Sequence, residues 1–388
     1  MDKRNIYADN AATTRVSDSV LNAMMPYFQQ NFANPSGLYS PATASAKAVR
    51  QARADIAKYL GTENGEVFFT SCGTEADNWA IKSAVELTGK RRIITSRLEH
   101  HAVLKTCEYL KSKGFEITYL PCPENGIIEP EELKKAIGND VAIVSVMLAN
   151  NEIGTIQKVS EMAEICHGYG VLMHTDAVQA VGNIPVDFKA LGVDMLSLSG
   201  HKIHAPKGIG ALVVRKGLNL PPFIHGGKQE LGRRAGTENV PYIMGLRQAI
   251  SDATTGIEER SEYVLCLRER LVDGLLKIEM TRLNGDRADR LPGNANISFY
   301  GIEGESLALL LDMKGICVSS GSACTTGETE PSHVLKAIGL SDEWAKGALR
   351  ITLSEDNTIE DVDYIVEMIT EIVGKLRASS TLWKRTIG

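Results

Sequence analysis

The sequence contains no apolar run long enough to cross a membrane. Its longest strongly apolar stretch, VAIVSVMLA at residues 141–149, falls far short of the roughly 20 residues that a membrane helix needs. The first residues, MDKRNIYADNAATT, have two basic side chains but no apolar stretch after them, so no secretory signal is expected. The formal net charge of -6 gives no excess of basic charge, which argues against nucleic acid or an anionic membrane as the partner. We therefore expect a cytoplasmic chain that acts on small molecules and proteins.

The cysteines lack the pattern of a disulfide framework or of a structural zinc site. There are 7 of them, an odd number, and none belongs to a CxxC pair, which favours free thiols in a reducing compartment. A metal site built from His100, His101, His174 and Asp176 is also disfavoured. The two adjacent histidines would point to different sides, and no HxxxH-type pair supports them. The sequence therefore predicts no metal.

Short β-rich runs alternate with helical patterns between residues 66 and 215, which predicts an α/β fold with a mostly parallel sheet covered on both faces. A long charged helical stretch follows at about residues 240–278. Beyond it, runs such as NANISFY, GICVSS and ALRITL alternate with helices and indicate a smaller α+β unit. We expect a large domain at residues 15–260 and a small domain made of residues 1–14 and 261–388.

Ligands of such sheets bind beyond the carboxyl ends of the strands. This rule gathers five segments into one candidate site: residues 70–74, 99–101, 150–152, 176–179 and 199–202.

Two of these segments suggest an anion site and a cation partner. Gly73 and Thr74 follow a predicted strand and open a helix, where backbone N–H groups and the helix dipole favour a phosphate. Taken alone, Thr74 is better explained as an N-cap. Asp176 ends a buried strand and needs a cationic partner, which a protonated ring nitrogen of a cofactor would supply. Taken alone, a helix cap or a structural ion pair explains Asp176 better.

Lys202 lies in the stretch SLSGHKIHAPKGIG, among small, polar and glycine residues. A lysine amine attacks a carbonyl only when it is partly neutral, and burial or neighbouring positive charge lowers its pKa from about 10.4. Ser199 and His201 could hold a phosphate beside it, and the flat ring of His100 could stack on a flat cofactor. Together with Asp176, these groups describe pyridoxal 5′-phosphate held as a Schiff base.

Motifs along nearly the whole chain match the pattern of one family in order. They are YADNAATT, NPSG, TSCGTEADN, EHHAV, ANNEIGTIQ, HTDAVQAVG, SGHKIHAPKGIGAL, HGGKQELGRRAGTENV, NISF, EGES, SSGSACT, EPSHVL and LRITLS. With these motifs the chain resembles the NifS/IscS type of cysteine desulfurase, within the class V aminotransferases. The resemblance implies an enzyme of PLP fold type I with a seven-stranded sheet. It also implies that the enzyme takes sulfur from L-cysteine, releases L-alanine and leaves a persulfide on its own cysteine.

The resemblance also assigns roles by position. Lys202 is implied to be the Schiff-base lysine, His100 the ring-stacking acid/base, and Cys324 the sulfur acceptor. Asp176 is implied to bind the pyridinium nitrogen and Gln179 the ring oxygen. The implied phosphate cradle consists of Gly73, Thr74, Ser199, His201 and, from a second subunit of a homodimer, Thr237. The implied contacts of the substrate carboxylate are Asn151 and Arg350, the latter bidentate.

Four features depart from the family pattern: Tyr39, Ala205, Lys346 and the LSED segment at residues 353–356. None is an implied catalytic group, so they bear on substrate loops and partner contacts. Two other functions stay open, namely an aminotransferase or selenocysteine lyase of the same fold, and a scaffold without catalysis. The Cys324 loop favours the desulfurase, because an aminotransferase needs no thiol there.

The acceptor of the sulfur is not disclosed by the sequence. Iron–sulfur scaffolds, tRNA thiolation and thiamine synthesis are all served by enzymes of this fold and type. The apolar Leu382 and Trp383 in the C-terminal tail would either dock a scaffold protein or pack back on the chain.

Overall fold

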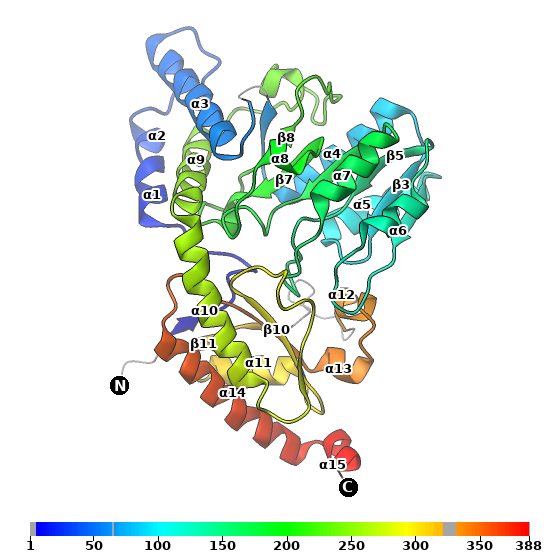
Figure 1. The fold of residues 1–388 in the computed structure, drawn as a ribbon. Coiled ribbons are helices and arrows are strands. Elements are labelled where there is room, and N and C mark those ends of the chain that lie inside the picture. The colour runs from blue at the N-terminus through cyan, green and yellow to red at the C-terminus, as the bar shows by residue number, and fades with distance from the viewer. Residues whose placement is uncertain (1–4, 64–65, 321–330, 388) are drawn as a thin grey trace.

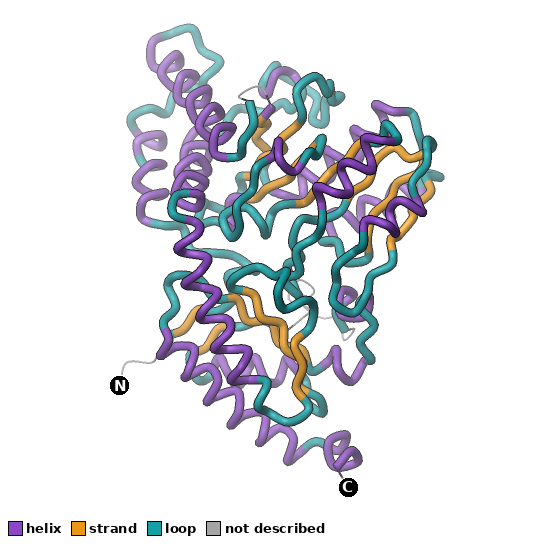
Figure 2. The backbone as a smooth tube through the Cα atoms, viewed as in Figure 1, coloured by secondary structure: helices purple, strands orange, loops and turns teal. Residues whose placement is uncertain are grey.

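The computed structural model describes residues 5–63, 66–320 and 331–387, which form two units (Figure 1). A 7-stranded sheet with helices on both faces makes the larger unit, and a 4-stranded sheet backed by long helices makes the smaller one. Figure 2 shows the two sheets in separate halves of the molecule, with loops from both halves meeting between them.

The large sheet is mostly parallel. Only β8 runs antiparallel to its neighbours β2 and β7. Because helices cover both faces, the central strands are continuous apolar runs rather than alternating ones, and all strands predicted between residues 66 and 215 are confirmed. In spatial order the strands are β2 (Val67–Thr70), β8 (Gly210–Val214), β7 (Met195–Ser199), β6 (Leu172–Asp176), β5 (Val141–Ser145), β3 (Arg92–Ser96) and β4 (Glu116–Leu120).

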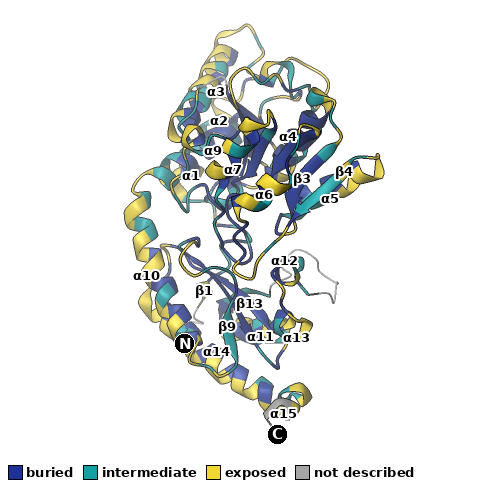
Figure 3. Cartoon of the chain, turned by 45° about the vertical axis from the view of Figure 1, so that its right-hand side comes forward, coloured by how far each residue is buried: buried dark blue, intermediate teal, exposed yellow. Residues whose placement is uncertain are grey.

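Two hydrophobic cores lie on the two faces of this sheet. On one face, Phe68, Ile93 and Met195 of the strands pack with α4 (Gly73–Thr88) and α5 (His101–Ser112). On the other face, the strands pack with α3 (Ser40–Tyr59), α6 (Pro130–Ala136), α7 (Val159–Gly168), α8 (Phe188–Leu191) and α9 (Val240–Thr254). Figure 3 accordingly shows the central strands as buried, the edge strand β4 as mostly intermediate, and the outer helix faces as exposed.

The smaller unit has its own core, in which Leu271, Phe299 and Ile369 are fully buried. Its antiparallel sheet has the order β12 (Ser319–Ser320), β13 (Ala348–Thr352), β10 (Asn294–Phe299) and β9 (Thr281–Leu283). It packs with α10 (Ile257–Leu275), α11 (Gly304–Asp312) and α14 (Ile359–Ser379). The N-terminal strand β1 (Ile6–Tyr7) pairs in parallel with β11 (Ile316–Cys317). The first residues of the described chain therefore belong to this unit.

The helical stretch predicted at residues 240–278 is two helices rather than one. Thr255 is extended, with ψ 123°, and Gly256 is left-handed, with φ 65°. This backbone ends α9 in the large unit and lets α10 start in a new direction in the small one. The break lies near the predicted domain boundary at residue 260, and that boundary itself stays a prediction.

The other helices are short. They are α1 (Asp18–Met24), α2 (Pro26–Gln29), α12 (His333–Ala337), α13 (Asp342–Lys346), α15 (Thr381–Ile387), and the 3-10 turns η2 (Gly200–Lys202) and η3 (Glu230–Gly232). Within the described ranges, no helix is both long and apolar enough to span a membrane. In the tail, the Trp383 ring lies 4.0 Å from the Arg377 guanidinium and also faces Gly301. Of the two tail alternatives, the structure has Trp383 packed back on the chain.

Candidate active site

Lys202 lies at the end of β7, in the turn η2. A Cβ on Gly200 would lie 2.9 Å from both Ala205 and Ile209, so the tight turn before the lysine requires a glycine. The Lys202 Nζ donates to the backbone carbonyls of Ala11 at 2.6 Å and Ala12 at 2.7 Å. Two carbonyls of the N-terminal segment thus hold the amine. Gln179 Nε2 donates to the same Ala11 carbonyl at 3.0 Å, which brings the two predicted residues together.

The start of α4 and the end of β7 form a candidate anion site. The N-cap residue of α4, Cys72, provides no side-chain cap, so the first N–H groups of the helix are available to a ligand. Ser199 Oγ is buried and has no hydrogen-bond partner among the described residues. A Cβ on Gly73 would lie only 3.4 Å from that of Ser199, so the two predicted residues are adjacent. An anion with several oxygens would satisfy both the hydroxyl and the helix end.

Two other predicted cradle residues lie at the edges of this site. Thr74 is exposed in the first turn of α4. His201 Nδ1 lies 3.2 Å from Thr13 Oγ1, and burial together with Lys202 lowers the pKa of His201 to about 4. Its imidazole is therefore neutral near pH 7 and acts as a hydrogen-bonding group rather than a cation.

Asp176 is the last residue of β6 and is buried. Burial raises the pKa of its carboxyl to about 6, while the N–H of Val178, which donates at 2.9 Å, and the charge of Lys202 oppose the rise. Asp77 on α4 is buried nearby, and burial together with the charge of Asp176 raises its pKa well above the ordinary value. The carboxylate predicted to bind a ring nitrogen therefore has a second, buried acid behind it.

The rest of this buried network is neutral. His174 Nδ1 lies 2.9 Å from Ser145 Oγ, and its Nε2 lies 2.9 Å from Ser197 Oγ. Burial lowers the pKa of His174 to about 3. His174 therefore supports the strand ends as a neutral, hydrogen-bonded ring. Across the described ranges, His, Cys, Asp and Glu side chains nowhere gather in a group of three that could hold a metal.

His100 caps the N-terminus of α5. Its Nδ1 accepts the N–H of Ala102 at 3.1 Å, which leaves Nε2 as the protonated nitrogen of the neutral ring. Burial, then Lys202 and the neighbouring His101 and His333, lower the pKa of His100 to about 4. A neutral ring near pH 7 is able to stack on a flat ligand and to exchange a proton.

Arg350 comes from β13 in the small unit, and its side chain is only 4% exposed. Its Nη1 donates to the backbone carbonyl of Asn151 at 3.1 Å, so the two predicted substrate residues are in contact. Its Nη2 donates to Asp9 Oδ1 at 3.0 Å. Nε is buried and has no partner within the described part of the chain. Asp9 was not among the predicted site residues.

Two further buried acids were missed as well, although the strand-end rule had gathered their segments. Glu99 accepts the N–H of Met147 at 3.0 Å and the hydroxyl of Ser96 at 2.7 Å, and burial raises its pKa to about 8. Glu152 hydrogen-bonds Ser332 at the start of α12, and burial raises its pKa to about 7. Their positions at strand ends were the available signal.

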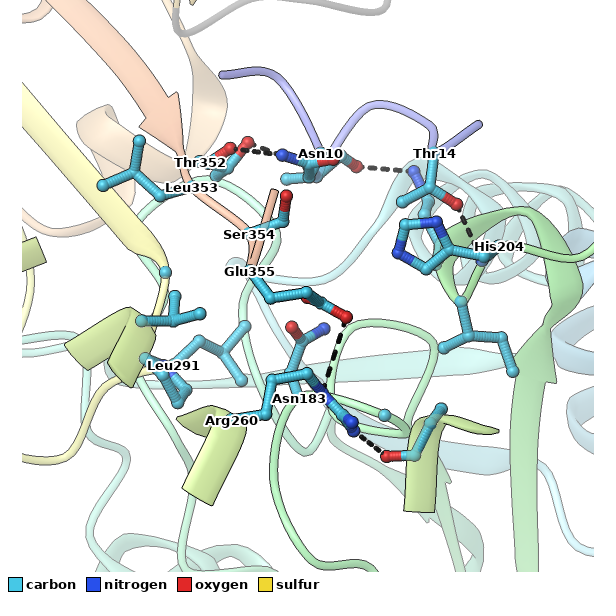
Figure 4. A pocket seen from close by; sticks show the side chains of 18 of the residues that line it. Asn10, Thr14, Asn183, His204, Arg260, Leu291, Thr352, Leu353, Ser354 and Glu355 are labelled. Carbon is cyan, nitrogen blue, oxygen red and sulfur yellow. Dashed lines mark hydrogen bonds and ion pairs between the residues drawn. The ribbon is translucent and has the colours of Figure 1, made fainter. Parts of the chain in front are cut away.

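The two units enclose a cavity of about 210 Å³ beside Lys202 (Figure 4). Asn10 and His204 line it, and Arg260 of α10 lies 3.7 Å from Glu355 across it. Since Glu355 belongs to the LSED segment, this departure from the family pattern contributes to the small unit's side of the cavity. The space beside the lysine is therefore bounded by both units.

Two predicted residues are not placed within this geometry. Cys324 lies outside the described residues, between β12 and α12. Thr237 is exposed in the loop before α9, and its assignment to a neighbouring subunit stays a prediction.

Comparison with known proteins gives one consistent result. The sequence model of the family "Aminotransferase class-V" matches residues 6–365. The chain is 52% identical over 384 residues to a cysteine desulfurase IscS of Methanosarcina thermophila, covering 98% of this chain and 95% of the relative. It is 45% identical to the cysteine desulfurase NifS of Azotobacter vinelandii, with 98% and 95% covered.

A solved NifS-like protein superposes with a TM-score of 0.90 at 40% identity, covering 96% of this chain and 100% of that one. The fold predicted from the resemblance is thereby confirmed. The chain belongs to the class V aminotransferase family and, within it, to the cysteine desulfurases of the NifS and IscS type.

Proposed function

We propose that the chain removes sulfur from L-cysteine with pyridoxal 5′-phosphate and delivers the sulfur through its own cysteine to an acceptor protein. The observation that carries the proposal is a pair of features next to Lys202: the buried Ser199 hydroxyl, which has no partner among the described residues, and the start of α4, which has no side-chain cap. Names of relatives at 45% and 52% identity support the same activity.

The residues present fit the cofactor. Ser199 and the first N–H groups of α4 suit its phosphate, Asp176 suits its ring nitrogen, and the neutral His100 ring suits one face of the pyridine. When bound, the cofactor supplies an electron sink for the α-carbon of the substrate. The phosphate would provide the hydrogen-bond partner that Ser199 Oγ lacks among the described residues.

Lys202 is proposed to hold the cofactor and to move the α-proton of the substrate. Its amine donates to the carbonyls of residues 11 and 12, and release from these two hydrogen bonds would make it available as a base. His100, neutral and with its proton on Nε2, is proposed to exchange a proton with the substrate thiol.

Cys324 is proposed to accept the sulfur. Its thiolate attacks the substrate sulfur, the C–S bond breaks with the electron pair kept on carbon, and an S–S bond forms. That carbon takes a proton and becomes the methyl group of L-alanine, while Cys324 carries a persulfide. A hydroxyl at this position cannot accept the sulfur.

Arg350 and Asn151 are proposed to bind the substrate carboxylate. The guanidinium is buried and its Nε lacks a partner among the described residues, so a carboxylate oxygen would complete its hydrogen bonding. We further propose a cytoplasmic homodimer in which Thr237 completes the phosphate site of the neighbouring subunit. The acceptor is proposed to be an iron–sulfur scaffold or another sulfur-acceptor protein.

The test uses the purified holoenzyme and L-cysteine, with alanine and enzyme-bound persulfide as readouts. In a single turnover, wild type should form alanine and persulfide in equal amounts. Cys324→Ser should keep the visible absorbance of the cofactor and yield almost no alanine or persulfide. Formation of a 2-oxo acid would favour an aminotransferase, and release of selenium at a much higher rate than sulfur would favour a selenocysteine lyase. A wild-type alanine rate in Cys324→Ser would contradict the role of that residue.

A further inference from the structure

Asp9 forms an ion pair with Arg350 and belongs to a part of the chain to which no role was assigned. It lies in the N-terminal segment (residues 9–12), which crosses from the small unit to the site. Its Oδ1 accepts from Arg350 Nη2 at 3.0 Å, and its Oδ2 accepts from Ser319 Oγ at 2.9 Å. Ser319 is the cross-strand partner of Arg350 in the sheet. The carboxylate of Asp9 therefore bridges two neighbouring strands at the position of the arginine.

The guanidinium is held at two of its three nitrogens. The Asp9 carboxylate accepts a hydrogen bond from Nη2 and the Asn151 carbonyl accepts one from Nη1. These two acceptors come from different segments of the chain. A guanidinium is planar, so two acceptors from different directions fix the orientation of the whole group. The remaining nitrogen, Nε, is buried without a partner among the described residues. Its N–H direction is fixed although the described residues offer it no acceptor.

A buried donor without an acceptor costs more free energy than a satisfied one. Glu152 is close enough to be influenced by the arginine, but its carboxyl is engaged with Ser332. In the described ranges Asp9 is the one carboxylate in an ion pair with Arg350. The fixed arrangement thus leaves a donor for an oxygen that arrives with a ligand.

We propose that Asp9 is a positioning residue that orients the Arg350 guanidinium so that its Nε–H meets the carboxylate of an amino-acid substrate. This inference rests on the proposed function, in which Arg350 binds that carboxylate. Asp9 acts through its hydrogen bond to Nη2. It therefore affects ligands that carry a carboxylate and leaves ligands without one unaffected.

The experiment compares two probes of the holoenzyme: L-alanine, which has a carboxylate and no thiol, and cysteamine, which has a thiol and no carboxylate. Binding is followed through the visible absorbance of the cofactor. Asp9→Ala should weaken the binding of L-alanine by about tenfold, which is the scale of one charge-assisted hydrogen bond. It should weaken the binding of cysteamine by less than about twofold. KM for L-cysteine should rise by a similar factor with kcat little changed.

Two further variants separate orientation from charge and from folding. Asp9→Asn keeps an acceptor for Nη2 and should bind L-alanine within about threefold of wild type. Tyr7→Phe is the matched control, because the Tyr7 hydroxyl ties down the same segment through the backbone carbonyls of Asp9 at 3.2 Å and Thr13 at 2.7 Å and forms no hydrogen bond to Arg350. It should leave both probes unchanged.

The proposal is overturned if Asp9→Ala weakens the binding of both probes equally, if it weakens the binding of neither, or if Tyr7→Phe has the same effect. If Asp9→Ala does not fold, Ser319→Ala tests the same contact from the other side and should weaken L-alanine selectively. Failure of the proposed function would look different, since wild type itself would then release no alanine from L-cysteine.

Discussion

Single side chains in this site differ in what they lack. The buried Ser199 hydroxyl has no partner within the described part of the chain, and burial of the Glu99 carboxyl disfavours its charged form. Both conditions lower the folding stability of the cofactor-free protein, and replacing one residue measures the size of each effect. The two costs have different signatures, because the hydroxyl is relieved by a ligand and the carboxyl by a proton.

Replacing Ser199 with alanine should change two properties in opposite directions. Loss of the hydroxyl should weaken the binding of pyridoxal 5′-phosphate by about tenfold, since a hydrogen bond to an anion is lost. The same change should raise the melting temperature of the cofactor-free protein, because an unpaired buried hydroxyl costs about 1–3 kcal/mol. Fluorescence titration and thermal unfolding measure the two effects. Ser145→Ala, which removes a hydroxyl bonded to His174, should instead lower that melting temperature; a lowered value for Ser199→Ala would contradict the assignment.

Glu99 should contribute stability that is lost as the pH rises from about 5 to 8. Burial raises its folded-state pKa to about 8, whereas an unfolded glutamate has a pKa of about 4.3. Between these values the folded chain binds more protons than the unfolded chain, so unfolding becomes easier with rising pH, by at most about 1.4 kcal/mol per unit.

Glu99→Gln should flatten this dependence. Its melting temperature should lie below that of wild type at pH 5, where it lacks a carboxyl contact, and should approach or exceed it at pH 8. Glu86→Gln, an exposed glutamate on α4, should keep the wild-type slope. Parallel pH curves for wild type and Glu99→Gln would show that Glu99 is ionised throughout.

At the scale of elements, the regular part of the fold was predictable and the irregular part was not. The strands of the large sheet stand out because apolar runs such as those at residues 141–145 and 195–199 are buried on both faces. The break between α9 and α10 was missed, since helical patterns continue on both sides of Thr255 and Gly256. The start of α4 was recognised because a strand, a glycine and a helical pattern follow one another.

The left-handed Gly256 should therefore resist substitution although it has open space around it. A Cβ there meets no atom within 4 Å, but its φ of 65° is unfavourable for other residues. Gly256→Ala should destabilise the protein by about 1 kcal/mol. Gly374→Ala also meets no atom, lies inside α14 without a positive φ, and should stabilise by about 0.5–1 kcal/mol. Thermal or urea unfolding compares the pair, and equal effects would rule out the backbone argument.

At the scale of the whole molecule, the site draws on segments far apart in sequence, which limits what the sequence could predict. Lys202, His100 and Asp176 were found because each lies in a recognisable local motif. Asp9 was missed because its partner lies 341 residues away. Asp77 was missed because an acid on a helix is ordinarily solvated, and only packing shows that this one is buried.

The proposed homodimer can be tested by mixing subunits. In a dimer where Thr237 serves the neighbouring site, a Lys202→Ala homodimer has no Schiff-base lysine, and a Thr237→Asp homodimer places a negative charge at both phosphate sites. A mixed dimer has one site with Lys202 and Thr237 both native. Unfolding and refolding the two variants together should therefore restore alanine formation above either alone. No gain on mixing, or a fully active monomer by light scattering, would refute the shared site.

The contact between residues 9 and 350 also fixes when this site forms during synthesis. Strand β1 pairs with residues 316 and 317, and Asp9 reaches an arginine made 341 positions later. At about 5–20 residues per second, the ribosome needs on the order of 20–70 s to cover that interval. For most of this time β1 and the Asp9 carboxylate lack the partners that they have in the folded protein, whereas the carbonyls of Ala11 and Ala12 can already meet Lys202. The large sheet can assemble early, but the substrate end of the site closes only when translation is nearly over.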